Sequence, residues 1–387
     1  MSDPLAILFV NMHHGWGGQP SVVLTLAKGL SQRGHRCVVG APDGSELMSR
    51  AAEAGIDVLP GLAFRRGLHP MSIRRDARII RECVASRGVQ IVESNGSQDT
   101  WAAALALGAR HKRKAPVRLV RWRHNSFPVK SHFLNRRLYG TLIDHVVVSS
   151  EGIKPILVEP GIVEESRITV LNPSVDPSRF REEFRSPEAR AACRAELGLG
   201  DDDLVVAAVG RLAEEKGHDV LFAAAKKVAA LVPRARFLII GKGTIEVELR
   251  ERARETGLAG TVVFAGFRTD IPRVLSACDV NALTPVSGES FGIVLLEGFC
   301  AGIPAVATDV GGVRSVCRDG ETGILCPAGD VDSIADAFVK LLSDAELGGQ
   351  YARNGKRMVE DEFTDERLME NAEALFRRLL ASGGDAL

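Results

Sequence analysis

The sequence has no apolar run long enough to span a membrane as a helix. Its longest apolar runs, such as VVLTLA and IVLL, are far shorter than the roughly 20 residues that cross a bilayer. A signal peptide is not evident either, because the polar start MSDP is followed only by a strand-length apolar run at 5–10. We therefore expect a cytoplasmic protein. With 387 residues, 45% of them hydrophobic and 25% charged, the chain is long enough for two ordinary domains.

Paired cysteine motifs are also missing. The seven cysteines are odd in number and scattered, and none forms a C-x-x-C pair, which argues against a disulfide framework or a zinc site. The acidic triplet 201–203 invites interpretation as a metal site. It stands just before a strand, however, and so at the amino edge of a sheet, where we interpret it as a solvated loop. We expect no metal, and cysteines that mostly fill the core.

The net charge is zero, but the charges are unevenly distributed. Residues 1–180 carry 24 Lys and Arg against 15 Asp and Glu, a net charge of +9, which leaves −9 for the remainder. This asymmetry indicates an anionic partner for the first half, although a solvated basic face explains it equally well. The basic residues of 110–123 are not punctuated by a series of stacking aromatic residues, since Trp122 is the single Phe, Tyr or Trp among them, so nucleic-acid binding is not predicted.

Strands alternate with helices throughout the first half of the chain. The apolar run 5–10 predicts a buried strand, and the helix that follows has one apolar face, formed by Val22, Val23, Leu26, Ala27 and Leu30. Further helices are predicted near 44–54 and 71–87, each followed by another short apolar run. This alternation is typical of α/β domains with a parallel, doubly wound sheet.

The loop HHGWGG connects the first strand to the first helix. It contains Gly17 and Gly18, but not the dinucleotide-binding pattern G-x-G-x-x-G, and no ribose-binding acid is evident. The two glycines alone are equally compatible with a tight turn. His13 and His14 in the same loop are candidates to line a ligand site.

A second candidate site follows the strand predicted at 117–122. Arg123, His124 and Asn125 fall at its carboxyl end, and ligands of open α/β sheets bind at the carboxyl ends of strands. We single out His124, although a lone histidine is more often structural. A polar, proline-rich stretch near 172–177 then marks the end of the first domain, which we place at residue 178.

Two stretches of the second half carry the most specific signals. The first, VVAAVGRLAEEKGHDVLFAA, predicts a strand at 204–209, a loop holding Arg211 and Lys216, and a helix. The second, ESFGIVLLE, places Glu289 in a loop and Glu297 about two turns into the helix that follows. Free amide groups at the start of that helix suit an anion such as a diphosphate. Taken alone, the second stretch is better explained by an acidic residue near a helix start and one surface glutamate.

Together these stretches resemble the retaining nucleotide-sugar glycosyltransferases of family 4, which have the GT-B fold. The resemblance implies two Rossmann-like, doubly wound parallel-sheet domains that face each other across a cleft. Residues 1–178 then form an acceptor-binding domain, residues 179–364 form a donor-binding domain, and a final helix within 365–387 packs back on the first domain. It also implies that Arg211 and Lys216 hold the donor diphosphate, that Glu289 contacts the sugar, and that Glu297 contacts the ribose.

The resemblance and the positions at strand ends define our candidate site. The catalytic candidates are Glu289, His124, Arg211 and Lys216. The residues assigned to donor binding are Gly17, Gly18, Arg211, Lys216, Gly241, Phe267, Arg268, Ser290, Phe291, Gly292, Ile293, Val294 and Glu297.

The expected reaction is glycosyl transfer with retained configuration, from a nucleoside-diphosphate sugar with UDP as the expected nucleotide. Negative charge builds on the leaving diphosphate, so the site needs fixed cationic donors more than a strong base. The family uses the leaving phosphate as base, which leaves Glu289 an orienting and electrostatic role, and we expect neither a cofactor nor a metal. The alternatives are a non-catalytic GT-B protein that binds nucleotides or sugars, and a sugar-nucleotide epimerase on the same fold.

The acceptor is expected to be a glycan or glycolipid of the bacterial cell envelope, such as a lipopolysaccharide core. If it is a phosphorylated glycolipid, basic residues of the first half should form a landing surface on the anionic inner face of the plasma membrane. The residues proposed for this surface are Arg65, Arg66, Arg110, Lys112, Arg113, Lys114, Arg136 and Arg137. The sequence does not indicate the oligomeric state.

Overall fold

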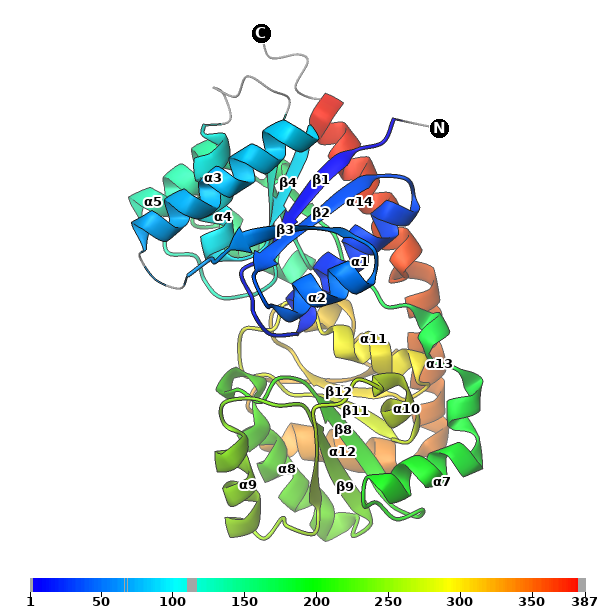
Figure 1. Cartoon of the computed structure of the whole chain (residues 1–387). Coiled ribbons are helices and arrows are strands. Elements are labelled where there is room, and N and C mark those ends of the chain that lie inside the picture. The colour runs from blue at the N-terminus through cyan, green and yellow to red at the C-terminus, as the bar shows by residue number, and fades with distance from the viewer. Residues whose placement is uncertain (1–2, 66, 68, 110–116, 382–387) are drawn as a thin grey trace. The chain divides into compact units, whose positions relative to one another are not determined.

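The structure, a computed structural model, describes residues 3–65, 67, 69–109 and 117–381. It divides into two compact units (Figure 1). The first unit comprises Met1–Pro173 and Asp365–Leu387, and the second comprises Ser174–Thr364. Five basic residues of the predicted landing surface lie outside the described residues: Arg66, Arg110, Lys112, Arg113 and Lys114.

The boundary between the units lies at Pro173, five residues before the predicted position at 178. The reason is a backbone contact inside the second unit. Val175 forms a β-bridge with Thr364, and its N–H donates to the carbonyl oxygen of Phe363 at 3.0 Å. The proline-rich stretch therefore begins the second unit as well as ending the first.

The first unit is built on a seven-stranded sheet in which neighbouring strands are parallel. Its order reverses between β1 and β4, so the carboxyl ends of these two strands flank the switch point at which open α/β sheets bind ligands. From edge to edge the strands are β3 (Asp57–Leu62), β2 (Arg36–Pro42), β1 (Ala6–Val10), β4 (Ile91–Ser94), β5 (Arg118–Arg123), β6 (His145–Val148) and β7 (Ile168–Val170).

Helices connect these strands, as the alternation in the sequence predicted. The helix of the first βαβ unit, α1, buries Val22, Val23, Leu26, Ala27 and Leu30, the apolar face predicted from the sequence. The helices of the unit are α1 (Gly18–Gln32), α2 (Glu46–Glu53), α3 (Pro70–Arg87), α4 (Ser97–Leu107), α5 (Phe133–Arg137), α6 (Lys154–Val158) and α14 (Asp365–Ala381).

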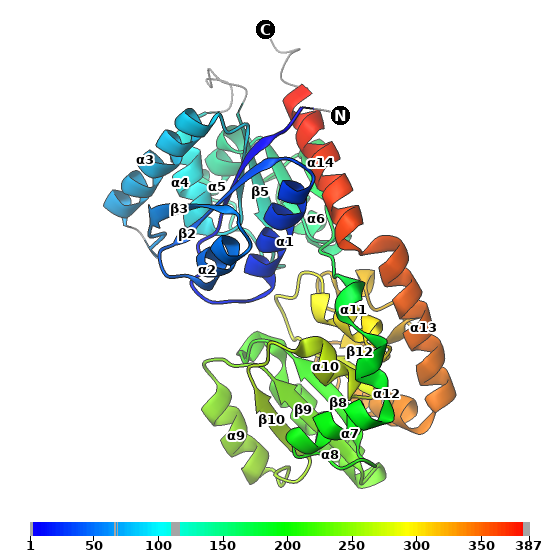
Figure 2. The same ribbon diagram turned by 45° about the vertical axis from the view of Figure 1, so that its right-hand side comes forward.

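The last helix, α14, belongs to the first unit although almost two hundred residues of the second unit precede it. It lies against α1 (Figure 2). Arg33, which caps α1, pairs with Glu366 at 2.6 Å and with Glu373 at 3.3 Å. The fold therefore contains the predicted C-terminal helix that packs on the first domain.

The second unit has a parallel six-stranded sheet of the same kind. Both of its faces are covered, because successive residues of β8 enter different apolar clusters: Val206 packs with Phe237 and Ala282, whereas Val205 and Ala207 pack in another cluster. The strand order is β10 (Val262–Gly266), β9 (Ala235–Ile240), β8 (Leu204–Val209), β11 (Val280–Leu283), β12 (Ala305–Thr308) and β13 (Gly323–Cys326).

One connection of the second unit contains no α-helix: only the 3-10 turn Val313–Ser315 separates β12 from β13. The α-helices are α7 (Pro187–Glu196), α8 (His218–Leu231), α9 (Glu246–Glu255), α10 (Ile271–Ser276), α11 (Ile293–Cys300), α12 (Val331–Ser343) and α13 (Ala345–Glu362).

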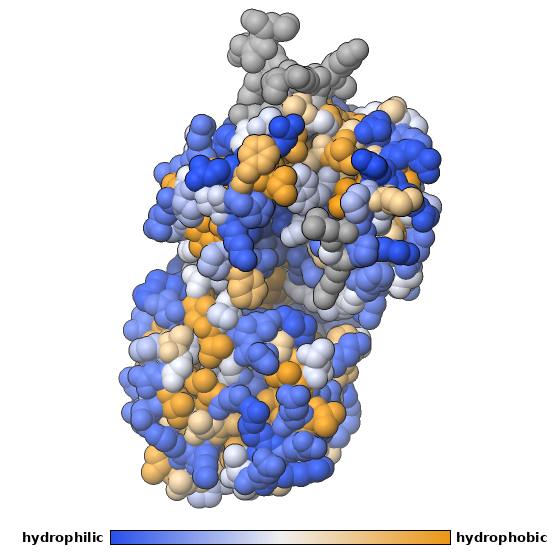
Figure 3. Space-filling model, turned by 90° about the vertical axis from the view of Figure 1, so that its left-hand side faces the viewer, coloured by the Kyte–Doolittle hydropathy of each residue, from blue (hydrophilic) through white to orange (hydrophobic). Residues whose placement is uncertain are grey.

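All seven cysteines are buried free thiols, as predicted. Within the described part of the chain, no helix combines the length and the apolar character that crossing a membrane requires. Hydrophilic and hydrophobic residues are interspersed on the molecular face drawn in Figure 3.

Candidate functional site

The carboxyl edge of the second sheet is built by backbone segments in close approach. A Cβ atom at Gly241, just after β9, would lie 1.8 Å from the carbonyl oxygen of Gly210, just after β8. Gly241 also has a φ of 147°, which L-residues rarely adopt. A Cβ atom at Gly243 would lie 1.9 Å from the carbonyl oxygen of Leu212. The loops after β8 and β9 therefore run side by side with no space for a side chain between them.

The loop after β8 also contacts the segment that follows β11. It ends at Gly217, where φ is 69° and an added Cβ atom would lie 2.0 Å from the carbonyl oxygen of Thr284. The N–H of Val286 donates to the carbonyl oxygen of Glu215 at 3.0 Å. Because β8 and β11 are neighbours in the sheet, this approach brings the two motifs found in the sequence to the same place.

Lys216 and Glu289 form an ion pair at this place. Lys216 Nζ lies 2.6 Å from Glu289 Oε2, and both side chains are mostly buried, with 27% and 12% of their surface exposed. The second carboxylate oxygen, Oε1, accepts hydrogen bonds from the amides of Ser290 at 3.1 Å and Phe291 at 3.4 Å. These amides, which we assigned to donor binding, thus contact the carboxylate of Glu289 in this structure.

Arg211 begins the same loop and is more exposed. Its guanidinium pairs with Glu215, one turn along the loop. The three residues predicted to carry the chemistry in the second domain therefore lie on contacting segments. Glu215, which sequence reasoning missed, is the partner that holds Arg211. The acidic triplet 201–203 precedes β8 and thus lies at the opposite end of that strand, where Asp203 pairs with Arg236 at 3.2 Å.

Helix α11 starts directly after Gly292 and carries Glu297, which is partly buried. Burial raises the pKa of the Glu297 carboxyl to about 7, against a smaller opposing effect of Arg179. The start of the helix is fixed from β11, where the buried amide of Asn281 donates to the carbonyl oxygen of Val294 at 2.7 Å. A carboxyl group that changes charge near neutral pH therefore lies on a rigid helix.

Two residues assigned to donor binding have side chains engaged elsewhere. Phe291 is 1% exposed and packs edge-on against Phe363, so its side chain belongs to the core. The guanidinium of Arg268 binds Asp270 through both carboxylate oxygens, at 2.8 and 2.7 Å, and Glu196 at 2.8 Å. Its charge is thus already balanced by two carboxylates.

Phe267 and a residue that we did not predict lie close together. The Nζ of Lys242 is 4.7 Å from the centre of the Phe267 ring, and that ring is 42% exposed. Lys242 stands between the two closely packed glycines after β9. The signal in the sequence was the Gly-Lys-Gly segment at a strand end, from which we had assigned only Gly241 to the site.

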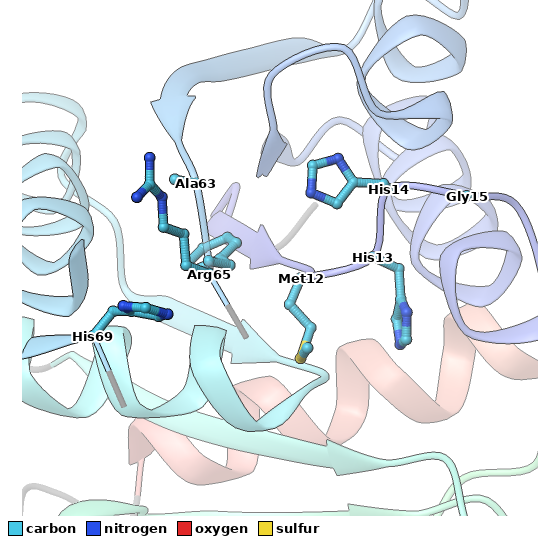
Figure 4. A pocket seen from close by; sticks show the side chains of 8 residues that line it. Met12, His13, His14, Gly15, Ala63, Arg65 and His69 are labelled. Carbon is cyan, nitrogen blue, oxygen red and sulfur yellow. The ribbon is translucent and has the colours of Figure 1, made fainter. Parts of the chain in front are cut away.

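The remaining predicted residues lie in the first unit. Gly17 caps α1, and Gly18 is its first residue. Just before them, the loop after β1 borders a pocket of about 520 Å³, whose described polar lining side chains are all basic. They are His13, His14, Arg65 and His69, all four of which are labelled in Figure 4.

The pocket wall contains a strained residue. Phe64 is the one non-glycine residue with positive φ, 40°, within the described chain. The buried carboxylate of Asp76 holds this backbone by accepting from the amides of Ala63 at 3.1 Å and Phe64 at 3.0 Å. Burial raises the pKa of Asp76. Strained backbone of this kind is concentrated at ligand sites, because the surrounding structure must be built to hold it.

His124 lies just beyond the carboxyl end of β5. Its Nε2 is 2.6 Å from Oδ1 of the buried Asn95, and its ring stacks on Trp122 with centres 5.4 Å apart. Burial and the positive charges of Arg121 and His13 lower the pKa of His124 well below its usual value. The histidine is therefore a neutral, rigidly held group near neutral pH.

Comparison with known proteins accounts for this architecture. Residues 190–358 match the model of the group 1 glycosyl transferases, and residues 16–179 match the model of glycosyltransferase family 4. This chain belongs to glycosyltransferase family 4. Its two parallel-sheet units are those of the GT-B fold, which solved structures share at low sequence identity. A Rickettsia africae glycosyltransferase has a TM-score of 0.85 and 19% identity, over 98% of this chain and 99% of that one.

One further solved structure and two sequence relatives are similar to this family 4 chain. Anabaena HepE, solved with UDP-glucose, has a TM-score of 0.82 and 22% identity over 96% of this chain and 99% of its own. The D-inositol 3-phosphate glycosyltransferase of Stackebrandtia nassauensis is 34% identical over 213 residues, 52% of this chain and 47% of the relative. The match thus spans about half the length of that relative. The lipopolysaccharide core biosynthesis mannosyltransferase LpsB of Rhizobium meliloti is 29% identical over 65% of this chain and 68% of its own.

The close approach at Gly241 gives a prediction for this family 4 protein. Gly241→Ala should destabilise the second unit by roughly 1–3 kcal/mol from backbone strain alone. The collision of the methyl group with the carbonyl oxygen of Gly210 should add to this cost. Hydrogen exchange of the β8 and β9 amides should report the change. Tryptophan fluorescence should not, because Trp16, Trp101 and Trp122 all lie in the first unit.

The matched control is Gly260→Ala, an exposed position with no atom within 4 Å of the added methyl group. It should leave the exchange rates unchanged. Equal protection in the two variants would show that the loops after β8 and β9 separate easily, against the packing described above.

Proposed function

We propose that this chain is a retaining glycosyltransferase that moves a sugar from a nucleoside-diphosphate sugar to a hydroxyl of a glycan or glycolipid. The observation that carries the proposal is the placement of Lys216, Arg211 and Glu289 on contacting loops at one sheet edge. The cationic side chains of Arg211 and Lys216 suit the diphosphate. The carboxylate of Glu289 suits the hydroxyls of the sugar. HepE, a protein of the same fold, was solved with UDP and with UDP-glucose, which supports UDP as the nucleotide.

The chemistry needs positive charge where the bond to the leaving group breaks. In the transition state the sugar becomes oxocarbenium-like and the diphosphate gains negative charge, which fixed cationic donors stabilise. Arg211 offers a planar fork and Lys216 a compact charge. Because Lys216 binds Glu289 in this structure, it must share its ammonium group between the carboxylate and the diphosphate of a bound donor. Retention and independence of metal ions are parts of the proposal.

The acceptor is proposed to carry a phosphate group. The pocket of the first unit is lined by three histidines and Arg65, a set that suits an anion. Two relatives support this class of acceptor: one is named for an inositol phosphate, and another is named for the lipopolysaccharide core. We therefore place the reaction in the synthesis of cell-envelope glycans or related phosphorylated glycosides.

A panel of UDP-, GDP- and ADP-sugars, offered with phosphorylated and neutral acceptors, tests the proposal. We expect one nucleotide sugar to release its nucleoside diphosphate in step with transfer, and the new bond to have the configuration of the donor when measured by NMR. Chelation of divalent ions should leave the rate within about twofold. Tight nucleotide binding without transfer would favour a non-catalytic protein, and conversion of the donor without acceptor would favour an epimerase.

Two substitutions complete this test. Glu289→Gln should lower kcat by about 100-fold with a small change in donor affinity, because the contact orients the sugar. Lys216→Met should lower both donor affinity and kcat, since the charge faces the diphosphate in both states. The control is Lys226→Met on the exposed side of α8, which should change neither quantity. Wild-type kcat in Glu289→Gln would disprove the assigned role.

The raised pKa of Glu297 gives a pH prediction. Its carboxylate accepts from ribose hydroxyls most strongly when ionised, so donor affinity should be nearly full at pH 8, about half of that at pH 7 and about tenfold lower at pH 6. The phosphates of an intact nucleotide sugar do not titrate in this range, so calorimetry with the donor isolates the protein group. In Glu297→Gln the affinity should be lower but independent of pH. An unchanged pH dependence in that variant would assign the titration to another group.

Loose attachment to an anionic membrane surface, on the cytoplasmic side, is a further part of the proposal. In α5, the exposed Phe133 and Leu134 adjoin Arg136 and Arg137, so apolar and basic side chains are presented together. Each basic residue near such a surface contributes about 1 kcal/mol. Arg65 lines the pocket instead.

Sedimentation with vesicles tests this attachment. The protein should pellet with vesicles containing anionic lipid at low salt, less at 0.5 M salt, and less again when Phe133 and Leu134 are both changed to Ser. The control Leu231→Ser, a similarly exposed residue of the second unit, should pellet like the wild type. Absence of pelleting at low salt would reject the membrane contact.

A further inference from the structure

The amide of Asn95 connects His124 to the interior of the first unit. Its Nδ2 lies 3.1 Å from the carbonyl oxygen of Val10 and 2.8 Å from Glu93 Oε2, and its Oδ1 lies 2.6 Å from His124 Nε2. Asn95 is 2% exposed and Glu93 is fully buried. The backbone N–H of Asn95 also donates to Asp99 at 3.2 Å. The side-chain amide is thus bound by groups from β1, β4 and the segment after β5, and the backbone N–H by a group from α4.

The neighbours of this amide determine which way it points. A backbone carbonyl oxygen such as that of Val10 can only accept a hydrogen bond, so the group facing it must be the NH₂ of Asn95. The same NH₂ also donates to Glu93 Oε2, which can accept a hydrogen bond in either protonation state. The amide oxygen is therefore left for His124, as the structure places it.

The amide oxygen determines in turn which ring nitrogen of His124 carries the proton. An amide oxygen has no hydrogen to give, so the 2.6 Å contact requires a proton on Nε2. A neutral imidazole has only one such proton, so Nδ1 then has a free lone pair. The structure shows no partner for Nδ1 among the described residues, and stacking on Trp122 fixes the plane of the ring.

The charges around the ring keep it neutral. Burial is the main effect, and Arg121 on β5 and His13 after β1 add positive charge, so the pKa of His124 lies well below its usual value. The acids behind the ring do not reverse this, because burial raises the pKa of Glu93 to about 8 and also raises that of Asp99. The wild-type ring should therefore stay neutral throughout pH 6 to 8.

We infer that Asn95 is a positioning residue that locks His124 in the Nε2–H form, so that Nδ1 accepts a hydrogen bond from a hydroxyl of the bound sugar or acceptor. The role in binding a hydroxyl rests on the proposed function. The locked ring does not, because it follows from contacts within the first unit. His124 thus acts through an acceptor nitrogen and supplies neither positive charge nor a proton.

Long-range ¹H–¹⁵N spectra of the histidine-labelled protein test the lock directly. The His124 signals, assigned by their loss in His124→Gln, should show a pyrrole-like Nε2 and a pyridine-like Nδ1, unchanged from pH 8 to pH 6. A protonated Nδ1, or an imidazolium within that range, would overturn the inference. This measurement needs neither substrate nor activity, so its failure is distinct from a failure of the proposed function in the donor panel.

Asn95→Leu tests the positioning role. The leucine has similar volume but no oxygen, so the two neutral forms of His124 should mix, and kcat should fall about tenfold or more with little change in donor affinity. The control Asn135→Leu removes an amide bonded to the carbonyl oxygen of Lys130 and should leave His124 and kcat unchanged. His145, bonded to Thr169 at 2.8 Å, should keep its signals in both variants. A pure Nε2–H signal with wild-type kcat in Asn95→Leu would refute the role of Asn95.

Discussion

The ion pair between Lys216 and Glu289 is the interaction on which the site of the second unit depends. The two residues are 73 positions apart, and they meet because β8 and β11 are neighbours whose following segments lie in contact. That contact requires glycine at position 217, because a Cβ atom there would collide with the carbonyl oxygen of Thr284. The geometry of the charges is therefore set by backbone packing. It depends little on the flexibility of the lysine and glutamate side chains themselves.

The first unit uses a different principle to hold its polar groups. Glu93, Asp99 and Arg121 are nearly fully buried at the carboxyl ends of β4 and β5 or at the start of α4. Burying such groups is unfavourable unless each finds partners, and a network with missing partners is costly. Asp99 accepts from the backbone amides of Asn95 and Gly96, and Glu93 Oε2 accepts from the side chain of Asn95. Within the described part of the chain, Glu93 Oε1 and Arg121 Nη1 have no hydrogen-bond partner. Rigidity around His124 thus comes from buried polar groups, whereas rigidity around Glu289 comes from glycine contacts.

The sequence predicted those elements whose pattern is local. The apolar stripe of α1 repeats over four turns, and β8 is a continuous apolar run closed by Gly210, so their faces and limits could be read from spacing. The motif containing Arg211 and Lys216, and the one starting at Glu289, could be placed because they follow such strands. Their contact followed from the order of the sheet, which the resemblance to a known fold supplied.

The remaining features depend on contacts between distant segments, which spacing does not reveal. Arg268 stands at a strand end, as a ligand-binding residue should, but Glu196 on α7 and Asp270 balance its charge. Phe291 lies inside the motif that starts at Glu289, yet its ring packs against Phe363 in the core. Neither the positive φ of Phe64 nor the carboxylate of Asp76 that holds it has a signal in the sequence.

The pairing of Lys216 with Glu289 has a consequence for selectivity. An inorganic phosphate bound to Lys216 would leave the mostly buried carboxylate of Glu289 without its cation. The free-energy cost of that unpaired charge would cancel much of the free energy gained by binding the phosphate. A molecule that joins a diphosphate to a hydroxyl-bearing ring offers a partner to each member of the pair. The ion pair should therefore disfavour the binding of small anions alone, and favour ligands in which the two chemical groups arrive together.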